Sequence, residues 1–155
     1  MLDRFEKFIC DITEIDLYWH RIASVEMKRF GLKGSYAIYF PMLKNSPEGM
    51  SAAELASMCG RDKADVSRDI SALEKAELLQ RIKSGGTAYR AKIVLTDKGR
   101  ELTEEIIKKA ELAVNCVGSM FTNEERDCFY RVLDEITRNL QTLSETGLPD
   151  GVKEQ

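Results

Sequence analysis

Apolar residues recur at intervals of three and four along most of the chain, and this periodicity limits the possible folds more than any other feature. One such stripe comprises Leu2, Phe5, Ile9, Ile12, Ile15, Trp19, Ile22 and Val25. The others comprise Leu102, Ile106, Ala110, Ala113 and Val117, then Phe129, Leu133, Ile136, Leu140 and Leu143. The spacing predicts three long amphipathic helices, one near the start of the sequence and two near its end.

The period changes to two between residues 79 and 95. Residues 79–83 and 88–95 flank the turn Ser84-Gly85-Gly86-Thr87, and in the second segment apolar residues alternate with Arg90 and Lys92. Alternation around a glycine turn is typical of a β-hairpin. The expected fold class is therefore mainly α with a small β-hairpin.

The size and composition of the chain indicate one ordinary globular domain. Its 155 residues lie near the usual size of a domain, so we expect residues 1–155 to form a single one. Ten glycines and three prolines are few for an all-β sandwich. No apolar run approaches the about 20 residues that a bilayer crossing requires, and the first seven residues interleave charged and apolar side chains, unlike a signal peptide. We expect a soluble, cytoplasmic protein.

The cysteines are too widely spaced to suggest a metal site or a disulfide framework. Cys10, Cys59, Cys116 and Cys128 form no C-x-x-C motif, and the single histidine, His20, cannot complete a zinc set with them locally. We therefore expect free thiols in a reducing compartment, with neither metal nor cofactor. A redox-sensing role, with Cys10 as the sensor, stays open as an alternative.

Helix-capping signals divide the middle of the chain into short helices. A helix is expected from Gly34 to about Leu43, where Pro41 should bend or end it. Ser51-Ala52-Ala53-Glu54 is a capping box that opens a helix whose buried face would be Leu55 and Met58. Gly60 ends this helix and Asp62 caps the next, in which Val66, Ile70 and Leu73 would face the core. Two helices joined by a tight turn predict a helix-turn-helix.

Positive charge is concentrated in the same region. Residues 61–100 hold ten basic and six acidic side chains, whereas residues 101–155 hold six basic and twelve acidic ones. A basic segment within an otherwise acidic chain favours a local anion-binding surface over a generally cationic protein.

The helix that follows Asp62 has the side chains that a DNA-reading helix needs. With its core face set by Val66, Ile70 and Leu73, the opposite face would carry small hydrogen-bonding residues and cations at 100° per residue. Arg68 could pair with a guanine or a phosphate, and the basic residues of the hairpin could reach the DNA backbone or minor groove. The predicted DNA-binding residues are Lys63, Ala64, Ser67, Arg68, Ser71, Lys75, Lys83 and Arg90. Asp62, Asp65 and Asp69 should cap the helix or orient basic neighbours.

Residues 32–100 resemble the winged helix-turn-helix of MarR-family bacterial transcription factors. The resemblance rests on Ser51-Ala52-Ala53-Glu54-Leu55-Ala56, on Val66-Ser67-Arg68-Asp69-Ile70-Ser71-Ala72-Leu73-Glu74-Lys75, on Leu78-Leu79-Gln80-Arg81 and on Leu95-Thr96-Asp97-Lys98-Gly99. The flanking helices also fit the family outline. The sequence departs from the family pattern at the wing tip, which lacks an aspartate, and at Glu77, where the family usually has glycine.

The terminal helices carry more apolar stripe than one small DNA-binding lobe can cover, so we expect a homodimer that binds a pseudo-palindromic operator on double-stranded DNA. Residues 1–30 and 101–146 would form the dimerisation region, and the protein would be a repressor that responds to a small-molecule effector. Trp19, His20, Tyr36 and Tyr39 could line the effector pocket. The other class left open is a winged-helix module that binds a protein instead of DNA. An enzyme is not expected, because the sequence has no G-x-S-x-G, phosphate-loop or H-E-x-x-H motif.

Overall fold

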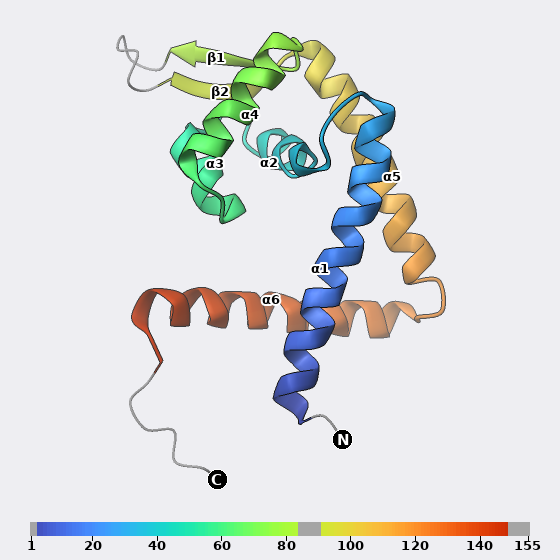
Figure 1. Ribbon diagram of the computed structural model, residues 1–155. Helices are drawn as coiled ribbons and strands as arrows, with labels where there is room; N and C mark the ends of the chain where they lie inside the picture. The colour runs from blue at the N-terminus through green and yellow to red at the C-terminus, as the bar shows by residue number, and fades with distance from the viewer. Residues whose placement is uncertain (1–2, 84–90, 149–155) are drawn as a thin grey trace. The chain divides into compact units, whose positions relative to one another are not determined.

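The computed structural model describes residues 3–83 and 91–148. The elements in chain order are α1 (Arg4–Arg29), the 3-10 helix η1 (Gly34–Tyr36), α2 (Tyr39–Lys44), α3 (Ala52–Cys59), α4 (Lys63–Lys75), β1 (Leu79–Lys83), β2 (Ala91–Leu95), α5 (Asp97–Val117) and α6 (Asn123–Thr146) (Figure 1). The prediction of a mainly helical chain with one small hairpin is confirmed. The chain divides into two compact units, Met1–Glu111 and Leu112–Gln155.

The long first helix forms over the predicted apolar stripe. Asp3 and Glu6 form a capping box at the start of α1, and Gly31 follows the end of the helix with a φ of 71°. Met27 is buried, whereas Ile9, Ile15, Ile22 and Val25 are largely exposed. The apolar stripe of α1 is therefore mostly left uncovered by the rest of the first unit.

The expectation of a single helix between Gly34 and Leu43 is wrong in detail. The segment forms η1 and then the separate helix α2. Pro41 is the third residue of α2 and does not end it. The backbone amides in the first turn of a helix have no acceptor within the helix, so the amide hydrogen that proline lacks would have made no helical hydrogen bond there.

The helix-turn-helix forms as the capping signals predict. Ser51 Oγ accepts a hydrogen bond from the Glu54 amide, and the Glu54 carboxylate accepts one from the Ser51 amide. Gly60 ends α3 in the left-handed conformation, and the Asp62 carboxylate then caps α4. One expectation fails: Met58 is 60% exposed, and Ala56 joins Leu55 in the core instead.

The hairpin is extended by a third backbone segment. β1 and β2 pair antiparallel with Leu79 opposite Leu95, and Met50, just before α3, exchanges two backbone hydrogen bonds with Ile93. The start of the helix-turn-helix is thereby fastened to the hairpin.

The core of the first unit packs against the inner face of α4. Its buried residues come from α2, α3, α4, the hairpin and the end of α1, with Leu102 and Ile106 of α5 packed against them. The side chains at or near zero exposure are Met27, Tyr39, Phe40, Leu55, Val66, Ile70, Leu73, Ile93 and Thr103. Val66, Ile70 and Leu73 thus hold α4 by the face that the sequence predicts.

The start of α5 is held tightly against the turn between α4 and β1. Thr96 Oγ1 accepts a hydrogen bond from the Gly99 amide and donates one to the Glu77 carbonyl. A Cβ at Gly99 would lie 2.0 Å from the Leu78 carbonyl oxygen, so only glycine permits this approach.

The second unit contains the end of α5 and the long helix α6. Thr122 and Glu125 form a capping box at the start of α6, and Gly147 follows the helix. No residue of α6 is buried, although its predicted apolar seam is present, with Phe129 57% and Leu140 52% exposed.

Candidate nucleic-acid interface

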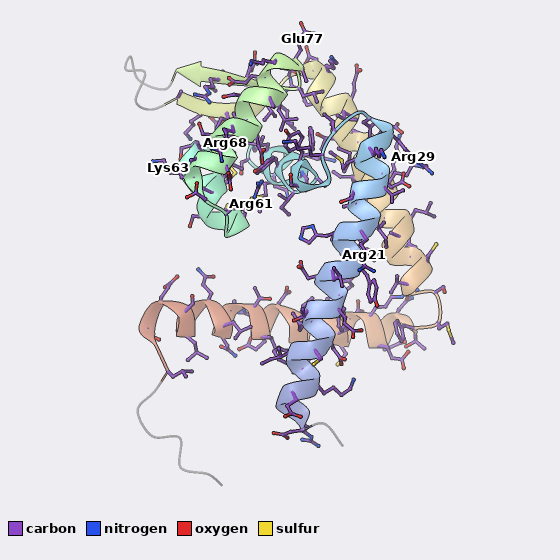
Figure 2. The ribbon with its side chains drawn as sticks, in the orientation of Figure 1. Arg21, Arg29, Arg61, Lys63, Arg68 and Glu77 are labelled. Atoms are coloured by element: carbon purple, nitrogen blue, oxygen red, sulfur yellow. The ribbon has the colours of Figure 1, made fainter. Side chains whose placement is uncertain are left out.

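The outer face of α4 carries the side chains that the sequence predicts. Lys63, Ala64, Arg68 and Lys75 are exposed, and Ser67 and Ser71 are half-buried at the edge of the same face. Figure 2 shows Lys63 and Arg68 on the first half of the helix. The helix therefore presents three cations and two hydroxyl groups between its two ends.

Two contacts within α4 shape this face. Arg68 forms an ion pair with Asp65 one turn earlier, and the Ser71 hydroxyl donates a hydrogen bond of 2.9 Å to the Ser67 carbonyl. The Arg68 side chain is 73% exposed, and exposed ion pairs contribute only about 0–1 kcal/mol. Arg68 can therefore exchange Asp65 for a stronger acceptor at little cost.

The hairpin predictions fall only partly on described residues. Lys83 is the last residue of β1, and Arg90 lies outside the described residues. Arg81, which does not belong to the predicted DNA-binding set, lies 3.2 Å from the Glu74 carboxylate at the end of α4. Its ion pair ties the strand to the helix.

Sequence reasoning missed Arg61, in the turn between α3 and α4. One of its guanidinium nitrogens, Nη1, donates a 2.6 Å hydrogen bond to Asp69 Oδ2 and another to the Tyr39 hydroxyl. The signal available in the sequence was Asp69 itself, since it lies beside Val66, Ile70 and Leu73 on the core face. A carboxylate at a core position requires a hydrogen-bonding partner, and the turn supplies it in the half-buried Arg61.

The four residues predicted for an effector pocket separate into two groups. Tyr36 and Tyr39 are buried, and the Tyr39 hydroxyl is occupied by Asp69 and Arg61. Trp19 is 41% exposed on α1, where His20 Nε2 lies 3.3 Å from Asp16. The burial of Tyr39 gives it a structural role, and the ligand role of these residues stays a prediction.

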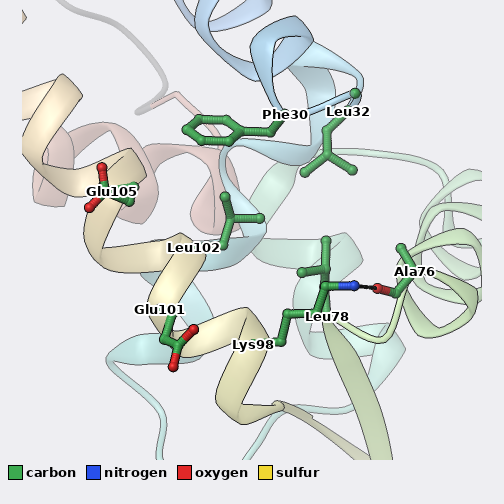
Figure 3. Close-up of a pocket in the computed structure, with 9 residues that line it drawn as sticks. Phe30, Leu32, Ala76, Leu78, Lys98, Glu101, Leu102 and Glu105 are labelled. Carbon is green, nitrogen blue, oxygen red and sulfur yellow. Dashed lines mark hydrogen bonds between the residues drawn. The ribbon is translucent and has the colours of Figure 1, made fainter.

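A shallow hollow in the first unit is lined by different residues. It lies between the end of α1, the turn after α4 and the first turns of α5 (Figure 3). Its apolar side chains are those of Phe30, Leu32, Ala76, Leu78 and Leu102. Lys98 Nζ closes one edge by donating to the Ala76 carbonyl at 2.9 Å.

The part of the chain that the structure describes contains neither a candidate metal site nor a candidate membrane-spanning helix. Among residues 3–83 and 91–148, no three histidine, cysteine or acidic side chains gather so as to hold a metal ion. Across the same residues, no helix combines the length and apolar character that crossing a membrane demands.

Comparison with known proteins identifies the fold. No protein-family model matches the chain. Over 120 residues it is 23% identical to the uncharacterized HTH-type transcriptional regulator YybA of Bacillus subtilis (strain 168), and the match covers 77% of this chain and 79% of that protein.

Solved structures give a stronger likeness over most of the chain. A Listeria monocytogenes protein assigned to the MarR family and complexed with 26mer DNA is similar with a TM-score of 0.79, at 22% identity, over 97% of this chain and 99% of that one. A MarR transcriptional regulator from Methanosarcina mazei Go1 gives 0.80 at 19% identity, covering 88% and 99%. The S. aureus MepR–DNA complex gives 0.73 at 19% identity, covering 86% and 97%. The chain therefore has the winged-helix fold of MarR-family regulators.

Proposed function

We propose that this chain is a MarR-family transcriptional regulator that binds double-stranded DNA as a homodimer in the cytoplasm. The observation that carries the proposal is the outer face of α4: Lys63, Arg68 and Lys75 are exposed on a helix whose other face is fixed in the core. The fold is shared with structures solved as DNA complexes.

In the proposed complex the beginning of α4 enters the major groove. Lys63, at the N-terminal tip, and Lys75 contact phosphates, and Arg68 leaves Asp65 to pair with a guanine edge. Ala64, Ser67 and Ser71 are small enough to allow the helix close to the bases. Lys83 and Arg90 of the hairpin reach the adjacent backbone or minor groove.

A second copy of the chain would cover the apolar stripes of the terminal helices. Ile15 and Val25 on α1, and Phe129 and Leu140 on α6, are each more than half exposed in the single chain. Obligate dimers commonly bury about 2,000–5,000 Å² of mainly apolar surface. A two-fold dimer would place two copies of α4 about 34 Å apart on a pseudo-palindromic site.

Regulation would follow from a change in the distance between the two copies of α4 in the dimer. An effector that binds one spacing of the DNA-binding lobes better than the other shifts the population between binding and non-binding dimers. In a repressor the effector favours the non-binding spacing.

Capture of genomic DNA tests the function and identifies the operator in the same experiment. Sheared DNA from the source organism is passed over immobilised protein, retained fragments are sequenced, and an enriched duplex is titrated by gel shift. We expect enrichment of fragments with a shared inverted repeat. Retention of no fragment above background would overturn the proposal and favour a protein-binding winged helix.

Substitution of Arg68 tests the interface itself. Arg68→Ala should weaken binding of the enriched duplex by about 1–3 kcal/mol if the guanidinium reads a base. Arg138→Ala is the matched control, because Arg138 forms an equivalent exposed i,i+3 ion pair, with Glu135 of α6. An affinity of the Arg68 variant equal to that of the control would exclude Arg68 from the interface.

A further inference from the structure

Three polar side chains from separate segments of the first unit meet at the buried face of α4. Tyr39 comes from α2, Arg61 from the turn before α4, and Asp69 from α4 itself. The Tyr39 hydroxyl donates to Asp69 Oδ2 at 3.0 Å, and Arg61 Nη1 donates to the same oxygen at 2.6 Å. The guanidinium also lies over the Tyr39 ring, 5.9 Å from its centre.

Burial makes these contacts costly to break. Tyr39 has no exposed surface and Asp69 is 7% exposed, so the carboxylate depends on its two donors for the stabilisation that water would otherwise give. Burial and the neighbouring carboxylate raise the pKa of Tyr39, which keeps its hydroxyl protonated and available as a donor.

The apolar contacts of α4 do not supply the same constraint. Val66, Ile70 and Leu73 hold the helix to the core, but hydrophobic contact has no preferred direction. Hydrogen bonds to Asp69 Oδ2 fix one point on the helix against α2 and the turn. Rotating α4 by about 20° would move an atom about 6 Å from its axis by about 2 Å, more than the distance range of a hydrogen bond allows.

The anchored point lies next to the proposed DNA-reading residues. Asp69 directly follows Arg68 and is two residues from both Ser67 and Ser71. A change in the rotation of α4 at Asp69 therefore displaces these three side chains together. Lys63 and Lys75, near the helix ends, carry flexible side chains that can still reach phosphates after such a change.

We propose that Tyr39, Arg61 and Asp69 act as a positioning cluster that sets the sequence selectivity of α4. The inference rests on the proposed DNA-binding function. The cluster holds the rotation of the recognition helix, so that its loss lowers affinity for the operator more than affinity for unrelated DNA. Arg61 acts through Asp69 and makes no phosphate contact of its own.

The test compares two duplexes over a range of salt concentrations. Affinities for the enriched duplex and for a scrambled duplex of equal composition are measured by fluorescence anisotropy for Tyr39→Phe, Asp69→Asn, Arg61→Met and Arg61→Lys. We expect the operator-to-scrambled ratio to fall about tenfold in Asp69→Asn and Arg61→Met, and about threefold in Tyr39→Phe. Arg61→Lys, which keeps a cationic donor, should restore most of the ratio.

The salt dependence separates positioning from direct contact. Loss of one phosphate contact lowers the slope of log affinity against log salt by about 0.9, and we expect no such change in Arg61→Met. A reduced slope would overturn the proposal by making Arg61 a phosphate ligand. A wild-type ratio in folded Asp69→Asn and Arg61→Met would overturn it as well.

Failures of the two proposals look different. If the wild-type protein binds no duplex, the DNA-binding function fails; if it binds selectively and the variants do too, only the positioning role fails. Should Asp69→Asn not fold, Tyr39→Phe decides the question, because it removes a single hydroxyl and leaves Arg61 paired with Asp69. A wild-type ratio in that variant would then contradict the proposal.

Discussion

The winged-helix core and the helix α6 both carry a regular apolar pattern, but only the core buries it among the elements of its own unit. In the core, residues such as Leu55, Ile70 and Leu73 are completely buried, whereas α6 has a regular apolar seam and no buried residue. The core gains its stability within one chain. The seam of α6 can gain stability only from something that covers it, and we propose that a second copy does so.

A matched pair of leucine substitutions should have the largest effect on stability. Leu73→Ala removes a fully buried side chain and is expected to lower the free energy of unfolding by about 3 kcal/mol. Leu140→Ala removes the same atoms from a side chain that is 52% exposed in one chain. Chemical denaturation at several protein concentrations should show a concentration-independent loss for the first and a concentration-dependent loss for the second. If both variants lose the same free energy of unfolding at every protein concentration, the proposal that a second copy covers the seam of α6 is contradicted.

A charge in the α6 seam sharpens the comparison further. Leu140→Glu should raise the dimer dissociation constant about 30-fold, which corresponds to about 2 kcal/mol, because a carboxylate would be buried against an apolar surface. Sedimentation equilibrium measures this directly. Asp134→Glu, an exposed acidic substitution elsewhere on α6, serves as the control. An unchanged dissociation constant in Leu140→Glu would show that the seam lies outside the interface.

The smallest effect is expected at the turn after α4. Glu77 is the one non-glycine residue with positive φ in the described ranges, at 61°, and it occupies the position where the family pattern has glycine. Glu77→Gly should raise the free energy of unfolding by about 1 kcal/mol by relieving the left-handed conformation. Glu77→Ala controls for the loss of the exposed contact with Lys98. If thermal melts show that Glu77→Gly is no more stable than Glu77→Ala, the backbone at Glu77 is not strained.

Local signals explain which parts of the fold could be predicted from the sequence. The capping residues Ser51 and Asp62 and the break at Gly60 act within a few residues of their own position. They gave the correct bounds of α3 and the correct start of α4, and the periodicity of Val66, Ile70 and Leu73 gave the correct buried face of α4.

The errors come from choices that only distant residues decide. Met58 and Ala56 are both plausible core positions on the short helix α3, and packing against the rest of the core selects Ala56. The partners of Asp69 lie 30 residues away at Tyr39 and 8 residues away at Arg61, so no local pattern links them. The sequence predicts the outer face of the candidate interface better than the contacts that hold it in place.

The most direct test of the central claim is a hydroxyl-radical footprint of the wild-type protein on an enriched duplex. Two copies of α4 on one face of the DNA predict two protected patches related by a two-fold axis, with centres about 10 base pairs apart. A uniform cleavage pattern at saturating protein, or a single unpaired patch, would contradict the account.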